Sequence, residues 1–278
     1  MLFRKNKGKK HDEKKGVKLI RVRGEPHGSH FMALYTDTDK FFEDVFKRVK
    51  LDNAFHMTEK PFADMGKQFI SAHLVELNDK LSVVAIFVMI KKKIEIATAY
   101  PVYWNGDTLN ARIDAIYEWP IQIEANIEAI VNDATVRFFA TDFFMERDGY
   151  IEAKIDRVRL WLLGYGLRVN PYKGKTIKLK NGPLKEVNLE KAELLWPYEK
   201  NKVLDEYLIT GSVKNIEKLK VLDETVYDIT VSNAPLKEIH ILVNEKNMES
   251  IPKPGDMVET VGWLEGMHHT EKWRTLKS

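Results

Sequence analysis

The sequence contains no cysteine. This absence excludes a disulfide framework, a thiol nucleophile and any zinc or iron–sulfur centre held by cysteine. A chain without cysteine also fits a reducing, intracellular setting, and we therefore predict a cytoplasmic protein.

Long apolar runs are absent as well. The strongest run is Leu81 to Ile90, LSVVAIFVMI, whereas a transmembrane helix needs about 20 such residues. The sequence therefore predicts no contact with a membrane. The many β-branched residues of this run, and the three lysines that follow it, predict a strand that is buried on both faces.

An excess of positive charge is absent outside the first residues of the chain. The net charge is +3, but residues 1–18 carry +6 and the remaining residues carry −3. Residues 1–18 have few apolar side chains, so we predict a disordered basic tail. Such a tail either keeps the protein soluble or acts as an electrostatic arm toward nucleic acid or an anionic surface.

The remaining sequence predicts one helix region followed by many strands. Aromatic residues at helical spacing predict a helix over Asp37 to Val49, capped by Asp37 or Thr38, and a weaker helix over 59–67. Period-two patterns then predict a series of strands, of which 121–130 is half-buried, and a hairpin over 175–189. The other predicted strands cover 68–77, 82–90, 95–104, 111–119, 135–144 and 158–169.

The predicted fold class is mainly β, a β-rich α+β fold with an N-terminal helix and an antiparallel sheet or barrel. The 278 residues are enough for one large domain or two ordinary ones. Residues 191–206 are expected to form a connector, because Pro197 would break any helix that begins at Ala192. We therefore predict a β-rich domain over 19–190 and a second domain over 207–278.

The second domain resembles an OB-fold barrel. Its predicted strands cover 207–216, 225–231, 238–243 and 258–267, with one helical turn within 245–250. Before the last strand stands Pro252-x-x-Gly255-Asp256-x-Val258, and Gly262 and Gly266 would let that strand coil. The resemblance implies a small five-stranded barrel, a fold often used to bind single-stranded nucleic acid. Residues 111–169 have a similar order, which leaves a second barrel open.

Charge argues against nucleic acid as the first choice of ligand. Residues 205–267 carry a net charge of −6, and phosphate contacts dominate the affinity of nucleic-acid-binding proteins. Residues 171–204 carry +4 and supply a possible basic patch. Lysines at alternate strand positions are otherwise typical of a solvated sheet edge.

Motifs of known enzymes are missing. The sequence has no P-loop, no dinucleotide-binding loop and no nucleophile elbow. The histidine pairs His27/His30 and His268/His269 stand in segments predicted to be irregular, so we expect exposed histidines and neither a metal nor a cofactor. Several acids on neighbouring predicted strands could form a carboxylate pair of the hydrolase type, although cross-strand pairing with Arg112 and Arg137 is the simpler interpretation. These acids are Asp114, Glu118, Glu124, Glu128 and Asp142.

The sequence therefore favours a non-enzymatic binding or scaffolding protein whose partner is another protein or a second copy of the chain. A single-stranded nucleic-acid-binding protein and a carboxylate-dependent hydrolase are the alternatives. Aromatic residues at predicted strand ends are the best candidates for an exposed contact surface: Tyr103, Trp104, Trp119 and Phe144. The candidate basic patch consists of Lys173, Lys175, Lys178 and Lys180.

Overall fold

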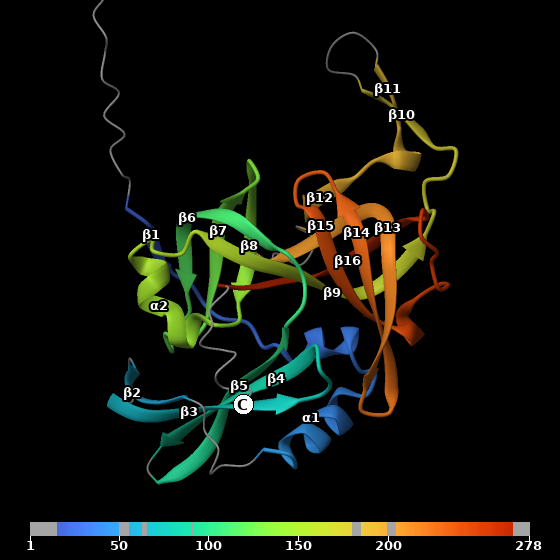
Figure 1. Cartoon of the computed structure of the whole chain (residues 1–278). Helices are drawn as coiled ribbons and strands as arrows, with labels where there is room; N and C mark the ends of the chain where they lie inside the picture. Colours follow the sequence, from blue (N-terminus) through green and yellow to red (C-terminus); the bar gives the residue numbers. More distant parts are fainter. Residues whose placement is uncertain are drawn as a thin grey trace, which may run out of the picture.

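The computed structural model describes residues 16–49, 56–62, 66–90, 92–179, 185–198 and 204–268. These residues form a mainly β protein, as predicted, built from a large mixed sheet and a smaller antiparallel sheet (Figure 1). The predicted basic tail over 1–18 lies outside the described residues up to position 15, and strand β1 (Lys18–Arg21) begins at its end. Among the described residues, no helix is both long and apolar enough to cross a membrane.

The large sheet contains ten strands in the order β1-β6-β7-β8-β16-β9-β15-β14-β13-β12. In chain order, the first five strands of this sheet are β1, β6 (Thr108–Glu118), β7 (Ala125–Val131), β8 (Ala134–Ala140) and β9 (Arg157–Val169). The other five are β12 (Leu194–Pro197), β13 (Glu206–Val221), β14 (Glu224–Asn233), β15 (Lys237–Asn244) and β16 (Met257–His268).

Two further pairings, β6 with β9 and β13 with β16, close this sheet into two barrels. The first barrel runs β6-β7-β8-β16-β9, and the second runs β9-β15-β14-β13-β16. Strands β9 and β16 therefore belong to both barrels, which lie side by side in Figure 1. Different parts of β9 pair with the two barrels. Its residues near Arg157 pair with β6 of the first barrel, and Trp161 to Leu163 pair with β15 of the second.

The second barrel shows the predicted OB-like order in part. Strands β13, β14 and β15 follow one another, a 3-10 turn η5 (Glu245–Asn247) comes next, and β16 returns to pair with β13. Its fifth strand is β9, which runs parallel to β15. The described part of this region, residues 207–268, thus does not close a cylinder alone. The domain boundary expected at 191–206 remains a prediction. The second barrel contains β9 from before those residues and β13, β14, β15 and β16 from after them.

The smaller sheet lies below the barrels in Figure 1 and has the order β2-β3-β4-β5. Its strands are β2 (His56–Phe62), β3 (Gly66–Glu76), β4 (Leu81–Ile90) and β5 (Lys93–Tyr103). The helix predicted over 59–67 is wrong, because Glu59 and Lys60 pair with β3 as part of β2. Cross-strand pairing overrides weak local helix propensity here.

Other local predictions are confirmed or corrected at single residues. Helix α1 (Thr38–Phe46) begins as predicted, with the Asp37 side chain accepting a hydrogen bond from the backbone N–H of Lys40 at 3.0 Å. The expected strand over 135–144 ends at Ala140, and helix α2 (Phe143–Ile151) follows. The half-buried alternation predicted for 121–130 is wrong, because Asn126 is buried and hydrogen-bonded inside the protein.

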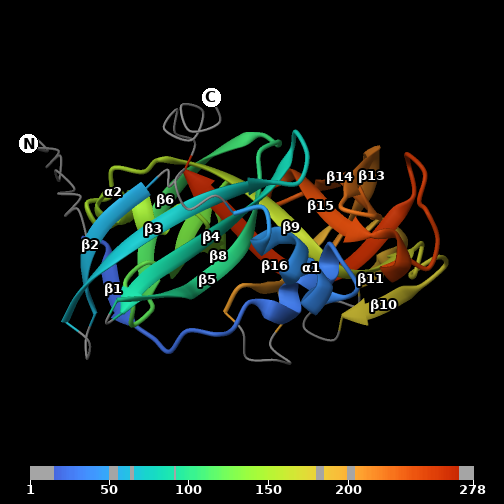
Figure 2. The ribbon, with the colours of Figure 1, turned by 90° about the horizontal axis from the view of Figure 1, so that it is seen from below.

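The remaining short elements are a 3-10 helix η1 (Gly28–Ala33), the predicted hairpin of β10 (Thr176–Leu179) with β11 (Lys185–Asn188), and η3 (Leu189–Lys191). The expected connector contains β12, which pairs with β13. One hydrophobic cluster fills the barrels, and a second lies between the smaller sheet, α1 and the barrel wall. Figure 2 shows β4 and β5 from below, alongside η1 and α1.

Candidate functional site

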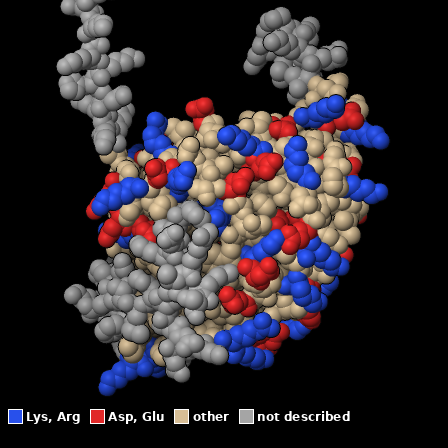
Figure 3. All heavy atoms as spheres, viewed as in Figure 1, with Lys and Arg blue, Asp and Glu red and all other residues tan. Residues whose placement is uncertain are grey.

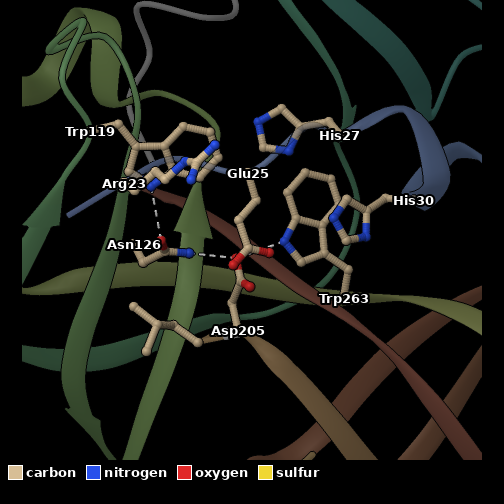
Figure 4. Close-up of a pocket in the computed structure, with 9 residues that line it drawn as sticks. Arg23, Glu25, His27, His30, Trp119, Asn126, Asp205 and Trp263 are labelled. Atoms are coloured by element: carbon tan, nitrogen blue, oxygen red, sulfur yellow. Dashed lines mark hydrogen bonds between the residues drawn. The ribbon is translucent and has the colours of Figure 1, made fainter. Parts of the chain in front are cut away.

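His27 lies where the barrel wall, η1 and the smaller sheet meet. Its ring is stacked between the indoles of Trp119 and Trp263, with centroid distances of 5.0 and 4.8 Å, and Phe139 approaches its edge at 4.7 Å. The residue is only 7% exposed. The ring belongs to the segment between β1 and η1, which carries it into this aromatic cage (Figure 4).

A buried carboxylate is the polar partner of His27. The Nε2 atom of His27 lies 2.8 Å from Oε1 of Glu124, and the Thr98 hydroxyl donates to the same oxygen at 2.6 Å. The Glu124 side chain is 4% exposed. Its second oxygen, Oε2, makes no hydrogen bond within the described part of the chain, and His27 Nδ1 likewise has no partner there. The cluster therefore keeps unused hydrogen-bonding capacity.

A second buried carboxyl group, Asp205, lies at the N–H edge of the Trp263 indole. Its Oδ2 atom accepts hydrogen bonds from the Trp263 indole N–H at 2.7 Å and from the Asn126 amide, as Figure 4 shows. Burial raises the pKa of Asp205 to about 7. The Trp161 indole similarly donates to Glu265 at 2.6 Å, and burial raises the pKa of Glu265 well above its usual range.

His30 links the cluster to β9 and β13. Its ring stacks on Trp263 with a centroid distance of 4.2 Å, and its Nδ1 atom contacts the Tyr165 hydroxyl. That hydroxyl donates to Glu206 at 3.0 Å. Burial, together with the neighbouring His27, lowers the pKa of His30 to about 3, so the ring is neutral near pH 7.

A cavity of about 390 Å³ adjoins this cluster, and we call it the junction cavity. Its polar residues include Glu124 and Thr98, and its walls are mostly apolar. Among the described residues that line it, two are acidic and none is lysine or arginine. The described lining consists of Glu25, Pro26, His27, Gly28, Phe42, Phe46, Ile96, Ala97, Thr98, Ala99 and Glu124.

The structure does not expose the predicted aromatic surface. Tyr103, Trp119 and Phe144 are at most 7% exposed, and Trp104 is half-buried with its indole N–H donating to Ser82 at 2.8 Å. The expectation of exposure is wrong because Tyr103, Trp119 and Phe144 pack in the hydrophobic cluster between the smaller sheet and the barrels, and Trp104 packs against that cluster. Of the four, Trp119 is next to the junction cavity through its contact with His27.

The predicted basic patch is described only in part. Lys173 and Lys175 are exposed, and Lys175 Nζ lies 5.6 Å from the centre of the Tyr172 ring. Lys178 lies on β10 with its side chain outside the description, and Lys180 lies outside the described residues. Figure 3 shows lysine and arginine interspersed with acidic side chains over the described part of that face.

Three of the five acids considered for hydrolase chemistry form ion pairs. The pairs are Asp114 with Arg112 at 3.1 Å, Glu118 with Arg147 at 2.6 Å, and Glu128 with Arg137 at 2.6 Å. The other two, Glu124 and Asp142, are buried. Two of the pairs use the arginines expected from the sequence. In the described part of the chain, no group of three or more side chains could hold a metal ion.

Sequence reasoning missed the roles of His27 and His30. Both were expected to be exposed, yet they are 7% and 6% exposed. Their surroundings, rich in glycine and proline, indicate an irregular segment and say nothing about what that segment packs against. His268 is half-buried, and His269 lies outside the described residues.

Comparison with known proteins gives no family. No protein-family model and no curated protein matches the chain. Among solved structures, the chain is similar to the cytoplasmic molybdate-binding protein ModG in a crystal form with molybdate bound. The match has 13% sequence identity and a TM-score of 0.30, and it covers 58% of this chain and 94% of that chain. A similarity at this level says nothing about what the present chain binds.

Proposed function

We propose that this protein is a non-enzymatic binding protein that takes a small amphipathic ligand into the junction cavity. The observation that carries the proposal is a cavity with apolar walls and a buried carboxylate, Glu124, in its lining. Its volume of about 390 Å³ is within the range of small-molecule sites, which are largely apolar with a few placed polar groups.

The surroundings of the cavity favour a preformed site. Aromatic stacking and the bond to Glu124 fix the His27 ring, and helix α1 supplies Phe42 and Phe46 to the opposite wall. A wall that is already ordered loses little conformational entropy when a ligand binds.

NMR of the Ile δ1 methyl groups tests this proposal. Ile96 lines the cavity, whereas Ile94 lies on the same strand outside the cavity lining and is 58% exposed. We expect at least one of three six-carbon probes, hexan-1-ol, n-hexylamine and hexanoate, to shift the Ile96 methyl signal saturably while the Ile94 signal stays in place.

Blocking the cavity supplies the control. Ala97→Phe places a ring in the lining and should abolish the saturable shift, whereas Ile94→Phe adds a similar ring beside the cavity and should not. The proposal is wrong if none of the three probes moves the Ile96 signal at millimolar concentration while the methyl spectrum remains that of a folded protein.

A further inference from the structure

Resting on the proposed function, we propose that the group recognised in the junction cavity is an alkylammonium: a primary amine cation on an aliphatic chain. The observation that points to it is the free oxygen of Glu124. Both hydrogen bonds that the carboxylate accepts, from Thr98 and from His27, fall on Oε1. Oε2 is left without a partner within the described residues, on a side chain that is only 4% exposed.

The charge of the lining selects a cation. Glu25 and Glu124 are the acidic side chains of the described lining, and the Nε2 atom of His27 is occupied by its bond to Glu124. His27 Nδ1 is buried and has no partner. A ligand that donates several hydrogen bonds can use Oε2, whereas an anion would meet two carboxylates and no lysine or arginine. A primary ammonium, with three donors and no acceptor, is the simplest group that fits.

The apolar wall selects an aliphatic chain. Phe42, Phe46 and Ile96 line the cavity, together with Ala97 and Ala99. Burying the methylene groups of a ligand against this surface contributes about 0.8 kcal/mol for each group.

The test compares head groups on one carbon chain. Binding of n-hexylamine, hexan-1-ol and hexanoate is measured from the Ile96 methyl shift at pH 7. We expect n-hexylamine to bind at least tenfold more tightly than hexan-1-ol, and hexanoate to bind more weakly than either. If hexan-1-ol or hexanoate binds as well as the amine, the cavity is a binding site but the alkylammonium proposal is overturned.

Two variants test whether the charge of Glu124 recognises the ammonium group. Glu124→Gln keeps an oxygen that can accept from Thr98 and His27 but removes the charge, so it should weaken n-hexylamine at least tenfold and leave hexan-1-ol nearly unchanged. Glu128→Gln, on strand β7 four residues after Glu124 and paired with Arg137, is the matched control and should change neither affinity. An equal loss for both probes in Glu124→Gln would contradict a role in recognising charge.

A last binding measurement distinguishes a free amine from the lysine side chain of a polypeptide as the natural ligand. The probe is Nα-acetyl-lysine N-methylamide, which carries an alkylammonium on a peptide backbone. Affinity within tenfold of n-hexylamine would assign the site to a lysine side chain, and a much weaker affinity would assign it to a free amine. Failure of all of these probes would overturn the cavity as a binding site and the choice of ligand together.

Discussion

Asp142 and Asp205 are carboxyl groups in fully buried positions. Burial raises the pKa of each to about 7, and each accepts hydrogen bonds from neighbours: Tyr150 donates to Asp142 at 2.8 Å, and Trp263 donates to Asp205. The hydrogen bonds favour the charged form of each carboxyl group, whereas burial favours the neutral form and has the larger effect. These residues make the stability of the fold sensitive to pH.

The sign of that sensitivity follows from proton binding. An unfolded aspartate has a pKa of about 3.9, so between about pH 4 and pH 7 the folded protein holds more protons than the unfolded chain. The free energy of unfolding therefore falls as pH rises, by at most about 1.4 kcal/mol per pH unit for each group. Burial of Glu265 acts in the same direction. His30, with its lowered pKa, acts in the opposite direction, but only below about pH 6.5.

We therefore expect urea unfolding to show a less stable protein at about pH 8 than at about pH 6.5. Asp205→Asn should remove on the order of 1 kcal/mol of that decrease, because its amide does not ionise. Asp148→Asn, whose side chain is 87% exposed, is the control and should keep the full decrease. A flat pH profile in the unsubstituted protein would contradict the burial of charge that this prediction assumes.

Strand β16 approaches the backbone of β9 closely at Gly262. At Gly262 the register with β9 shifts, and the strand lies against the backbone of Leu163 and Gly164. A Cβ atom added at Gly262 would come within 2.2 Å of the Leu163 carbonyl oxygen. The glycine is therefore required by a close approach of two backbones, which a side chain would force apart.

Gly262→Ala should lower the free energy of unfolding by about 2 kcal/mol or more, because backbone atoms must move to admit the methyl group. Denaturant unfolding monitored by tryptophan fluorescence measures this change. Gly16→Ala is the control, since nothing lies within 4 Å of a Cβ atom at that position, and its stability should match that of the unsubstituted protein. Equal stability of the two variants would show that β16 can move away from β9.

Local sequence patterns predict where strands and helices lie better than they predict which strands pair with one another. Period-two alternation and the Asp37 cap are properties of neighbouring residues, so the main strands and α1 could be found from the sequence. The pairing of β9 with β16 joins residues about a hundred positions apart, such as Gly164 and Gly262, and no local pattern contains it. The same holds for the site, because Thr98, Glu124 and His27 come from three separate segments.

At the scale of the whole molecule, the two barrels share two of their strands, β9 and β16. If either strand leaves one barrel, the other barrel opens as well. The hydrophobic cluster that contains Trp161 and Trp263 also includes residues of the smaller sheet, such as Tyr100 and Val102. We therefore expect one cooperative unfolding transition for both barrels and not two separate ones.

A fragment covering 204–278 should consequently be unfolded on its own, because it lacks β9. Its two-dimensional amide NMR spectrum should show poorly dispersed signals, whereas the full chain should show the wide dispersion of a β protein. Mixing the fragment with one covering 1–198 is the control for its competence to fold and should restore dispersed signals. A well-dispersed spectrum from the fragment alone would show that 207–278 is an independent domain.

The place of β16 in chain order affects how the protein acquires its structure during translation. The ribosome makes β6, β7, β8 and β9 first, yet their barrel stays open until β16 emerges, after every other strand. Until then the nascent polypeptide carries unpaired edges and uncovered apolar side chains, the condition in which β-rich chains associate wrongly. We therefore expect the unfinished chain to be prone to aggregation until β16 has been made.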